Sequence, residues 1–341
     1  MEQDSRKKRP VWKIVLLVFG LVLLIGGSAF GYFVYKANET AENANSELTR
    51  GDKSDRREET VDLTKDHFSV LLAGVDGGAS LEEEGRTDSL MVATFNKESR
   101  QVTLVSIPRD SYVDIVTTDG EFKDKINHAY AYGGIDTTIA TVEKLFDIPI
   151  DYYATINFDG IEDLVDAVGG VEVDVLVPIS GRATGNVELE PGVQTLDGKE
   201  ALAYARMRKD DPEGDVGRAK RQQQVLEAII NEATTINSFT KLNRIMNAVG
   251  DNIRTNMSLS EASQLQPYTK SLRSFNQETL AGGDLTIGGV YYYELDPADL
   301  SEKRSLLKTE LGLPLTAEDS DNGTGDGLNE TEDGFSETTT Y

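Results

Sequence analysis

Six basic residues are crowded into one short stretch of a strongly acidic chain. The stretch YARMRKDDPEGDVGRAKRQQQ runs from Tyr204 to Gln224, whereas the chain of 341 residues has a formal net charge of -25. Its basic residues are Arg206, Arg208, Lys209, Arg218, Lys220 and Arg221. Clustered cations of this kind bind phosphate, and arginine adds bidentate hydrogen bonds that lysine cannot make. The stretch therefore predicts an anion-binding site, unless the acidic residues in its middle neutralise a solvated basic face.

The second half of this stretch predicts the start of a helix near Val216. Arg218 then falls in the first turn, with Gln222 one turn later on the same face. A cation in the first turn opposes the helix dipole, which favours anions there by ~0.3–1 kcal/mol. A bound phosphate removes this conflict, because the helix N-terminus and the guanidinium group both contact it. Arg206 and Arg208 project to the same side if the chain is extended there.

Two aspartates stand at the ends of neighbouring predicted strands. Asp76 follows one apolar run, and Asp88 immediately precedes the next. Open α/β sheets bind ligands at such strand ends, and two carboxylates together with water and phosphate oxygens suit Mg2+. The pattern predicts a magnesium site, unless both aspartates serve only as turn formers. With two histidines and no cysteine, a metal centre built from those side chains is not expected.

Two further cations are candidates for the same edge. Arg109 follows Pro108, which ends a predicted strand, although an arginine beside a turn aspartate is also typical of a simple surface ion pair. Lys125 lies in DKINHAYAYGG, whose Asn, Tyr and Gly residues suit an ordered loop equally well. The sequence has no G-x-S-x-G motif and no P-loop lysine motif, so a serine hydrolase or a nucleotide kinase has no support.

The elements that must position these residues alternate between strands and helices. Residues 68–75, the hairpin 89–108, and residues 152–157 and 171–177 have the composition of strands. Residues 134–146, 158–168, 218–233 and 242–253 have apolar residues at helical spacing. This order predicts an α/β fold, a three-layer α/β/α arrangement with a central mixed β-sheet, preceded by one N-terminal transmembrane helix.

The ends of the chain predict a membrane-anchored protein. Residues 14–35 carry no charge and match the ~20 residues of a membrane-spanning helix. Because basic residues precede this span, residues 1–13 are expected in the cytoplasm and the rest outside; the alternative is a cleaved signal peptide. Residues 36–66 are expected to form a polar stalk, residues 67–315 a folded domain outside the cell, and residues 316–341 a disordered acidic tail.

Taken in order, the motifs resemble those of the LytR-CpsA-Psr family. They are LLAGVD, GRTDSLMV, SIPRDSYV, KINHAYAYGG, VGGVEVDV, LDGKEALAYARMRKDD and GDVGRAKRQQQ. The resemblance implies a phosphotransferase on the outer face of a Gram-positive type cell membrane. It would move wall teichoic acid or capsular polysaccharide from polyprenyl pyrophosphate to the C6 hydroxyl of N-acetylmuramic acid in peptidoglycan. The acidic insert GASLEEE before Arg86 departs from the family pattern.

The resemblance also implies roles for individual residues. Asp76 and Asp88 take the Mg2+ positions, and Arg86 accompanies them. The pyrophosphate-binding positions fall on Arg109, Arg206, Arg208, Arg218 and Gln222, with Lys125 and Arg221 as helpers. As a hypothesis, Asp76 takes the proton from the acceptor hydroxyl. The helix faces at 135–146 and 161–168 are candidates for an apolar tunnel that holds the polyprenyl tail, and they are equally well explained as core.

Three other functions stay open. A membrane-bound transcriptional attenuator or regulator conflicts with a basic cluster outside the cell and with the acidic charge of the chain. A hydrolase would use the same site with water as acceptor. A lipid-glycan binding module would bind the carrier and turn nothing over.

Overall fold

The fold is built around a six-stranded mixed β-sheet. The computed structural model describes residues 35–76, 85–180, 185–207, 211, 214–234, 239–272, 275–316 and 319. The order of strands in the sheet is β10-β3-β2-β1-β6-β9. Their bounds are β1 Phe68–Asp76, β2 Arg86–Phe95, β3 Val102–Ser106, β6 Tyr152–Asn157, β9 Ile253–Thr255 and β10 Asn276–Thr279. The pairs β1–β6 and β3–β10 are parallel and the other pairs antiparallel, which confirms the predicted mixed sheet and its β2–β3 hairpin.

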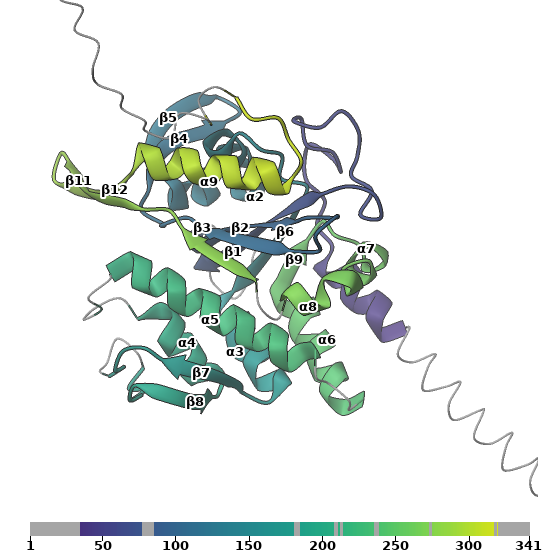
Figure 1. The fold of residues 1–341 in the computed structure, drawn as a ribbon. Helices are drawn as coiled ribbons and strands as arrows, with labels where there is room; N and C mark the ends of the chain where they lie inside the picture. The colour runs from purple at the N-terminus through teal and green to yellow at the C-terminus, as the bar shows by residue number, and fades with distance from the viewer. Residues whose placement is uncertain are drawn as a thin grey trace, which may run out of the picture.

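Helices cover both faces of this sheet and complete three layers (Figure 1). One face carries α2 (Ala129–Phe146) and α9 (Pro297–Glu310), and the other carries α5 (Gly214–Thr234). On the first face, buried side chains of β1 and β2 pack with Phe146 of α2 and Leu307 of α9. On the second face, the cluster around Phe68 and Met91 includes residues of α5. The alternation of side chains along β1 and β2 thus fills two cores.

The second face continues into a smaller unit below α5. It contains α3 (Phe158–Val168), α4 (Gly198–Arg206) and the ribbon of β7 (Val171–Val175) with β8 (Gly192–Leu196) (Figure 1). Because β7 pairs only with β8 among the described strands, the predicted strand at 171–177 lies outside the central sheet. Helix α3 begins where the Asn157 side chain accepts a hydrogen bond from Gly160 N, and it ends at Gly169, as its Gly-Gly pair predicts.

Further elements frame these layers. Two hairpins lie near α2 and α9: β4 (Tyr112–Thr117) with β5 (Gly120–Lys125), and β11 (Gly282–Ile287) with β12 (Val290–Leu295). Other helices are η1 (Ile126–His128), α6 (Phe239–Asn252), α7 (Leu259–Ser263), η3 (Gln266–Tyr268) and α8 (Thr269–Leu272), and residues 35–44 are also helical.

Most of the segment expected to be a polar stalk packs against the domain. Leu48 and Leu63 are buried in two of the cores. Arg57 forms an ion pair of 2.8 Å with Asp151, which is 4% exposed, and Arg50 pairs with Glu143 at 2.9 Å. The sequence hides this packing because two isolated leucines and paired charges leave no apolar period.

Both predicted end segments fall largely outside the described residues. The expected membrane span, residues 14–35, is described only at Tyr35, and within the described chain no helix combines the length and the apolar character needed to cross a membrane. Of the expected acidic tail, Thr316 and Asp319 are described, and Asp319 pairs with Lys308 at 2.8 Å.

Candidate active site

The paired ends of β1 and β2 bring three of the predicted site residues together. Asp76 lies opposite Arg86, and the register shifts between Gly74 and Val75, so that Asp88 is an extra residue in β2. Directly opposite residues share a face of the sheet, and a bulge of this kind re-aims side chains. Asp76 and Arg86 are exposed at this edge, and Asp88 is half-buried.

A chain of ion pairs connects Asp88 with the next two predicted cations. The Arg109 guanidinium contacts the Asp88 carboxylate through Nη1, and its Nε lies 3.5 Å from Asp110 Oδ2. The other oxygen of Asp110 accepts from Lys125 Nζ at 2.9 Å, and the Asp110 side chain is 2% exposed. One buried carboxylate therefore holds two cations near the edge of the sheet. Lys125 also lies 5.5 Å from the centre of the Tyr292 ring, a cation–π contact.

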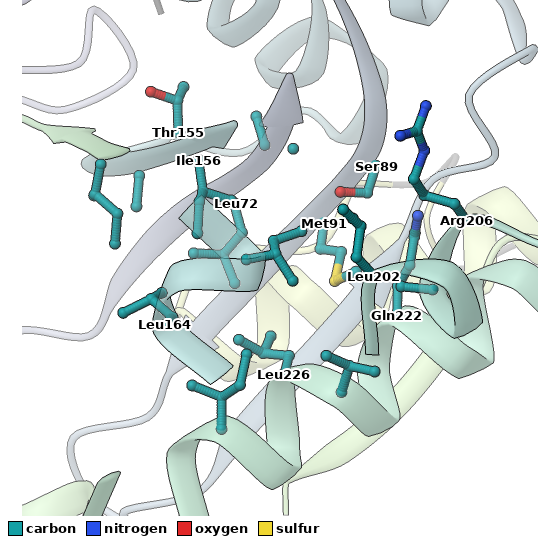
Figure 2. A pocket seen from close by; sticks show the side chains of 18 residues that line it. Leu72, Ser89, Met91, Thr155, Ile156, Leu164, Leu202, Arg206, Gln222 and Leu226 are labelled. Carbon is teal, nitrogen blue, oxygen red and sulfur yellow. The ribbon is translucent and has the colours of Figure 1, made fainter. Parts of the chain in front are cut away.

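An apolar pocket of about 220 Å³ opens between the sheet and the helices below it (Figure 2). Its apolar lining comes from β1, β2, β6, β9, α3, α4 and α5, with Leu72, Met91, Ile156, Leu164, Leu202 and Leu226 among the residues. Arg206 and Gln222 lie together on one side of the pocket, close to Ser89 in the view of Figure 2. The arrangement suits a ligand with a long apolar tail and a polar head.

Side-chain alternation places the strand-end residues on the face of this pocket. Leu72 and Gly74 line the pocket from β1, so Asp76, two residues further, points to the same face. Gly74 lies there because a Cβ atom would stand 2.4 Å from Ser89 Oγ. The polar edge of the sheet and the apolar pocket therefore adjoin each other.

Helix α5 is anchored so that its polar residues face this region. Gln223, which is 2% exposed, donates hydrogen bonds to Ser106 Oγ at 2.8 Å and to the Glu278 carbonyl at 3.1 Å. This fixes the rotation of α5 against β3 and β10. Gln222 then lines the pocket, and Arg218, which is 7% exposed, lies one turn before it. The helix begins at Gly214, two residues earlier than the sequence predicts.

Arg221, a predicted helper at the pyrophosphate, is buried and makes internal contacts. Its side chain is 1% exposed and pairs with Asp211, while Nε donates to the Tyr204 carbonyl at 3.0 Å and Nη2 to the Met207 carbonyl. Gly217 gives room for this pair, because a Cβ atom there would lie 2.1 Å from Asp211 Oδ2. Arg221 therefore ties α4 to α5 internally, through burial that the sequence does not reveal, and its role as a helper at the pyrophosphate stays a prediction.

The structure does not describe every predicted site residue. Arg208 lies outside the described residues.

Asp76 and Asp88 offer the hard oxygen donors that Mg2+ prefers, and this ion takes one or two carboxylates together with waters and substrate phosphates. Among the described residues no group of three or more His, Asp or Glu side chains forms a complete protein cage. The donor set therefore fits Mg2+ bound jointly with a phosphate ligand.

Sequence reasoning missed several residues of this region. The sequence indicates only a turn aspartate at Asp110, next to Arg109. The structure shows that its buried carboxylate pairs with two cations. Of the two helix faces predicted to hold the polyprenyl tail, only one lines the pocket. Ile161 and Leu164 of α3 line it, whereas the face of α2 from Ile139 to Phe146 belongs to the core on the opposite side of the sheet. Leu226 of α5 had no signal beyond its helical spacing.

The chain is similar to known proteins along most of its length. The model of the LytR_cpsA_psr family matches residues 31–309. The polyisoprenyl-teichoic acid–peptidoglycan teichoic acid transferase TagT of Bacillus subtilis is 38% identical over 322 residues, which cover 91% of this chain and 98% of TagT.

Solved structures agree with this similarity. A structure of TagT with bound octaprenyl pyrophosphate lipid has 37% identity and a TM-score of 0.64, covering 79% of this chain and 100% of that one. A structure from Enterococcus faecalis described as a transcriptional regulator has 38% identity and a TM-score of 0.67, covering 77% of this chain and 95% of that one.

Proposed function

The chain belongs to the LytR_cpsA_psr family, and we propose that it is a phosphotransferase that attaches an anionic glycopolymer to peptidoglycan. The donor is a polyprenyl-pyrophosphate carrier, and the acceptor is the C6 hydroxyl of N-acetylmuramic acid. Wall teichoic acid is the favoured polymer because TagT is named a teichoic acid transferase. Capsular polysaccharide is the alternative anionic polymer.

The observation that carries this proposal is the apolar pocket that adjoins a row of cations. The pocket takes the prenyl tail, and Arg206 and Gln222 on its polar side take the pyrophosphate. Arg109, in the turn after β3, and Arg218 of α5 add further charge. TagT, at 37% identity, binds octaprenyl pyrophosphate. A soluble polar anion would not need the apolar lining, so this combination favours a lipid-linked donor.

The chemistry follows from which groups surround the pyrophosphate. The acceptor hydroxyl attacks the phosphorus that bears the glycan, the bond to the bridging oxygen breaks, and polyprenyl phosphate leaves. Arginines stabilise the charge that develops on these oxygens, at ~1.5–3 kcal/mol for each charged hydrogen bond. Mg2+ held by Asp76 and Asp88 would neutralise further negative charge. Asp76 takes the proton, because it is exposed at the strand end while Asp88 is engaged by Arg109.

The same proposal assigns a location. Residues 14–35 anchor the chain in the cell membrane, and the domain lies outside, where carrier and peptidoglycan meet.

Regulation of transcription is the second candidate function, and the description of the E. faecalis structure is its support. A formal net charge of -25 opposes binding to DNA. The cations near the pocket lie beside an apolar lining, which favours a lipid-linked ligand over DNA.

A reconstituted reaction tests the transferase. The full chain in detergent micelles is incubated with a short-chain polyprenyl-pyrophosphate disaccharide, Mg2+ and soluble peptidoglycan fragments, and products are read by mass spectrometry. Arg206→Ala removes a cation at the pocket, and Arg244→Ala removes an exposed one on α6 as the control. We expect a phosphodiester adduct from the wild type and from Arg244→Ala only. Release of polyprenyl phosphate without adduct would indicate a hydrolase, and carrier binding without turnover a binding module.

A second comparison tests the proton acceptor. Asp76→Ala should lower turnover far more than carrier affinity, since the base acts only when the hydroxyl attacks. Equal losses in turnover and affinity would instead assign Asp76 to binding.

A further inference from the structure

A second cleft, of about 560 Å³, lies on the opposite side of the sheet from the apolar pocket. It is formed by the β4–β5 hairpin, the first part of α2 and Thr49, and Figure 1 shows that hairpin beside α2. Two aromatic side chains line it, Phe122 of β5 and Tyr132 of α2. They are 41% and 50% exposed and lie next to each other, so together they form an exposed apolar patch.

The two rings are held in a fixed arrangement. Their centres are 5.0 Å apart with an edge-to-face angle of 84°. The Tyr132 hydroxyl donates to Asp124 Oδ2 at 2.7 Å, and the same oxygen lies 2.8 Å from His128 Nδ1. This hydrogen bond, together with burial, raises the pKa of Tyr132, so its hydroxyl remains a neutral donor. An exposed aromatic surface that is already rigid binds a partner at a small entropic cost.

This aromatic surface is connected to the strand-end site. Asp124 precedes Lys125, which shares the Asp110 carboxylate with Arg109. Arg86, opposite Asp76 at the start of β2, acts electrostatically to lower the pKa of Tyr132, against the larger effect of Asp124. A chain molecule lying over the rings would therefore extend toward Asp76.

The charge of the cleft narrows the class of ligand. Its lining contains Asp119, Glu121 and Asp136 and no lysine or arginine, all of its lining residues being described. Lys144 pairs with Glu121 from outside the lining, and Asp136 accepts hydrogen bonds from Thr49, which leaves Asp119 exposed at the hairpin turn. A polyanion is repelled here, whereas a neutral sugar or an ammonium group is not.

We infer that this cleft binds the glycan strand of the acceptor, with a pyranose ring stacked on Phe122 and Tyr132. Sugar rings present an apolar face of C–H groups, which aromatic rings cover, and hydroxyl groups, which Thr117, Thr118 and Asp119 meet at the rim. N-acetylated sugars are neutral, and a free amine of a stem peptide suits the acidic rim. The inference rests on the proposed transferase for the identity of the acceptor. It assigns the acceptor to a cleft whose acidic residues repel the anionic donor polymer.

The test separates acceptor recognition from catalysis. Transfer by the full chain in micelles is measured as a function of the concentration of soluble, uncrosslinked peptidoglycan strands, and carrier affinity is measured separately. Phe122→Ala is compared with Val193→Ala, an exposed apolar side chain on β8, and thermal unfolding confirms that both variants fold. We expect the acceptor KM of Phe122→Ala to rise about tenfold, with kcat and carrier affinity unchanged. Tyr132→Ala should act in the same direction, and Val193→Ala should match the wild type.

A binding measurement without carrier makes the outcome independent of the transferase. If the wild type transfers nothing yet binds peptidoglycan strands, and Phe122→Ala weakens that binding, the glycan site stands and the proposed function fails. If transfer proceeds and the acceptor KM of Phe122→Ala is unchanged, the transferase stands and the glycan site is wrong. A loss of carrier affinity in Phe122→Ala would place the donor sugar in the cleft and would equally overturn the inference.

Discussion

Replacing Arg221 by methionine tests whether this arginine holds the fold together or binds substrate. The side chains of Arg221 and Asp211 are 1% and 2% exposed, so the methionine variant takes a buried cation away from a buried carboxylate. It also removes the donors to the carbonyl groups of Tyr204 and Met207. Breaking a buried ion pair from one side costs about 3–5 kcal/mol, because the remaining buried charge loses a charged partner. We expect the free energy of unfolding to fall by this amount.

Urea unfolding of the full chain in micelles, followed by circular dichroism, measures this loss. Lys220→Met, at the exposed neighbouring position, is the control and should change stability by at most ~1 kcal/mol. Replacing both partners, Arg221→Met with Asp211→Leu, should restore part of the stability, because neither charge of this pair is then left buried. If Arg221→Met is as stable as the wild type but binds the carrier poorly, Arg221 belongs to the phosphate site and the reasoning is wrong.

Three further results are expected. A chain that begins at Asp66 should be at least ~3 kcal/mol less stable to urea than one that begins at Lys36, because it lacks the partner of buried Asp151. Leu226→Trp fills the apolar pocket, so affinity for octaprenyl pyrophosphate should fall about tenfold while affinity for inorganic pyrophosphate stays unchanged. Burial acts to raise the pKa of Asp124, but hydrogen bonds from His128 and Tyr132 outweigh it and lower the pKa. Its contribution to stability is therefore present above ~pH 4 and lost as the pH falls through the lower folded value, so the difference in melting temperature between wild type and Asp124→Asn should vanish in strong acid.

Local patterns were sufficient for most elements of the central sheet. The β2–β3 hairpin and helix α3 with its Gly169 stop were predicted, because turn residues and apolar periods are local signals. The strand at Val171–Val175 was assigned correctly but not its partner, since pairing with β8 depends on contacts distant in sequence. The packing of residues 45–66 was missed for the same reason: its ion pairs join Arg50 and Arg57 to carboxylates about a hundred residues away.

The site shows a similar division. Residue type and motif order pointed to Asp76, Asp88 and Arg109, and the structure brings these to neighbouring strand ends. Burial is the part that the sequence does not show: Arg221 is 1% exposed and pairs with Asp211, and Arg218, three residues earlier, is 7% exposed. A sequence gives the spacing of such arginines along the helix, but neither their burial nor their internal partners.

The positions of the two clefts constrain where transfer takes place. The apolar pocket lies on the α5 face of the sheet, and the aromatic cleft lies against α2 on the opposite face. A donor and an acceptor bound in them are separated by the sheet itself, so their reacting groups meet only where the sheet ends. That end is formed by Asp76 and Arg86, where the β-bulge at Asp88 interrupts the pairing of β1 with β2. With the prenyl tail and the glycan strand bound as proposed, the phosphate and the hydroxyl would meet beside Asp76 while the two bulky chains that carry them remain on separate faces.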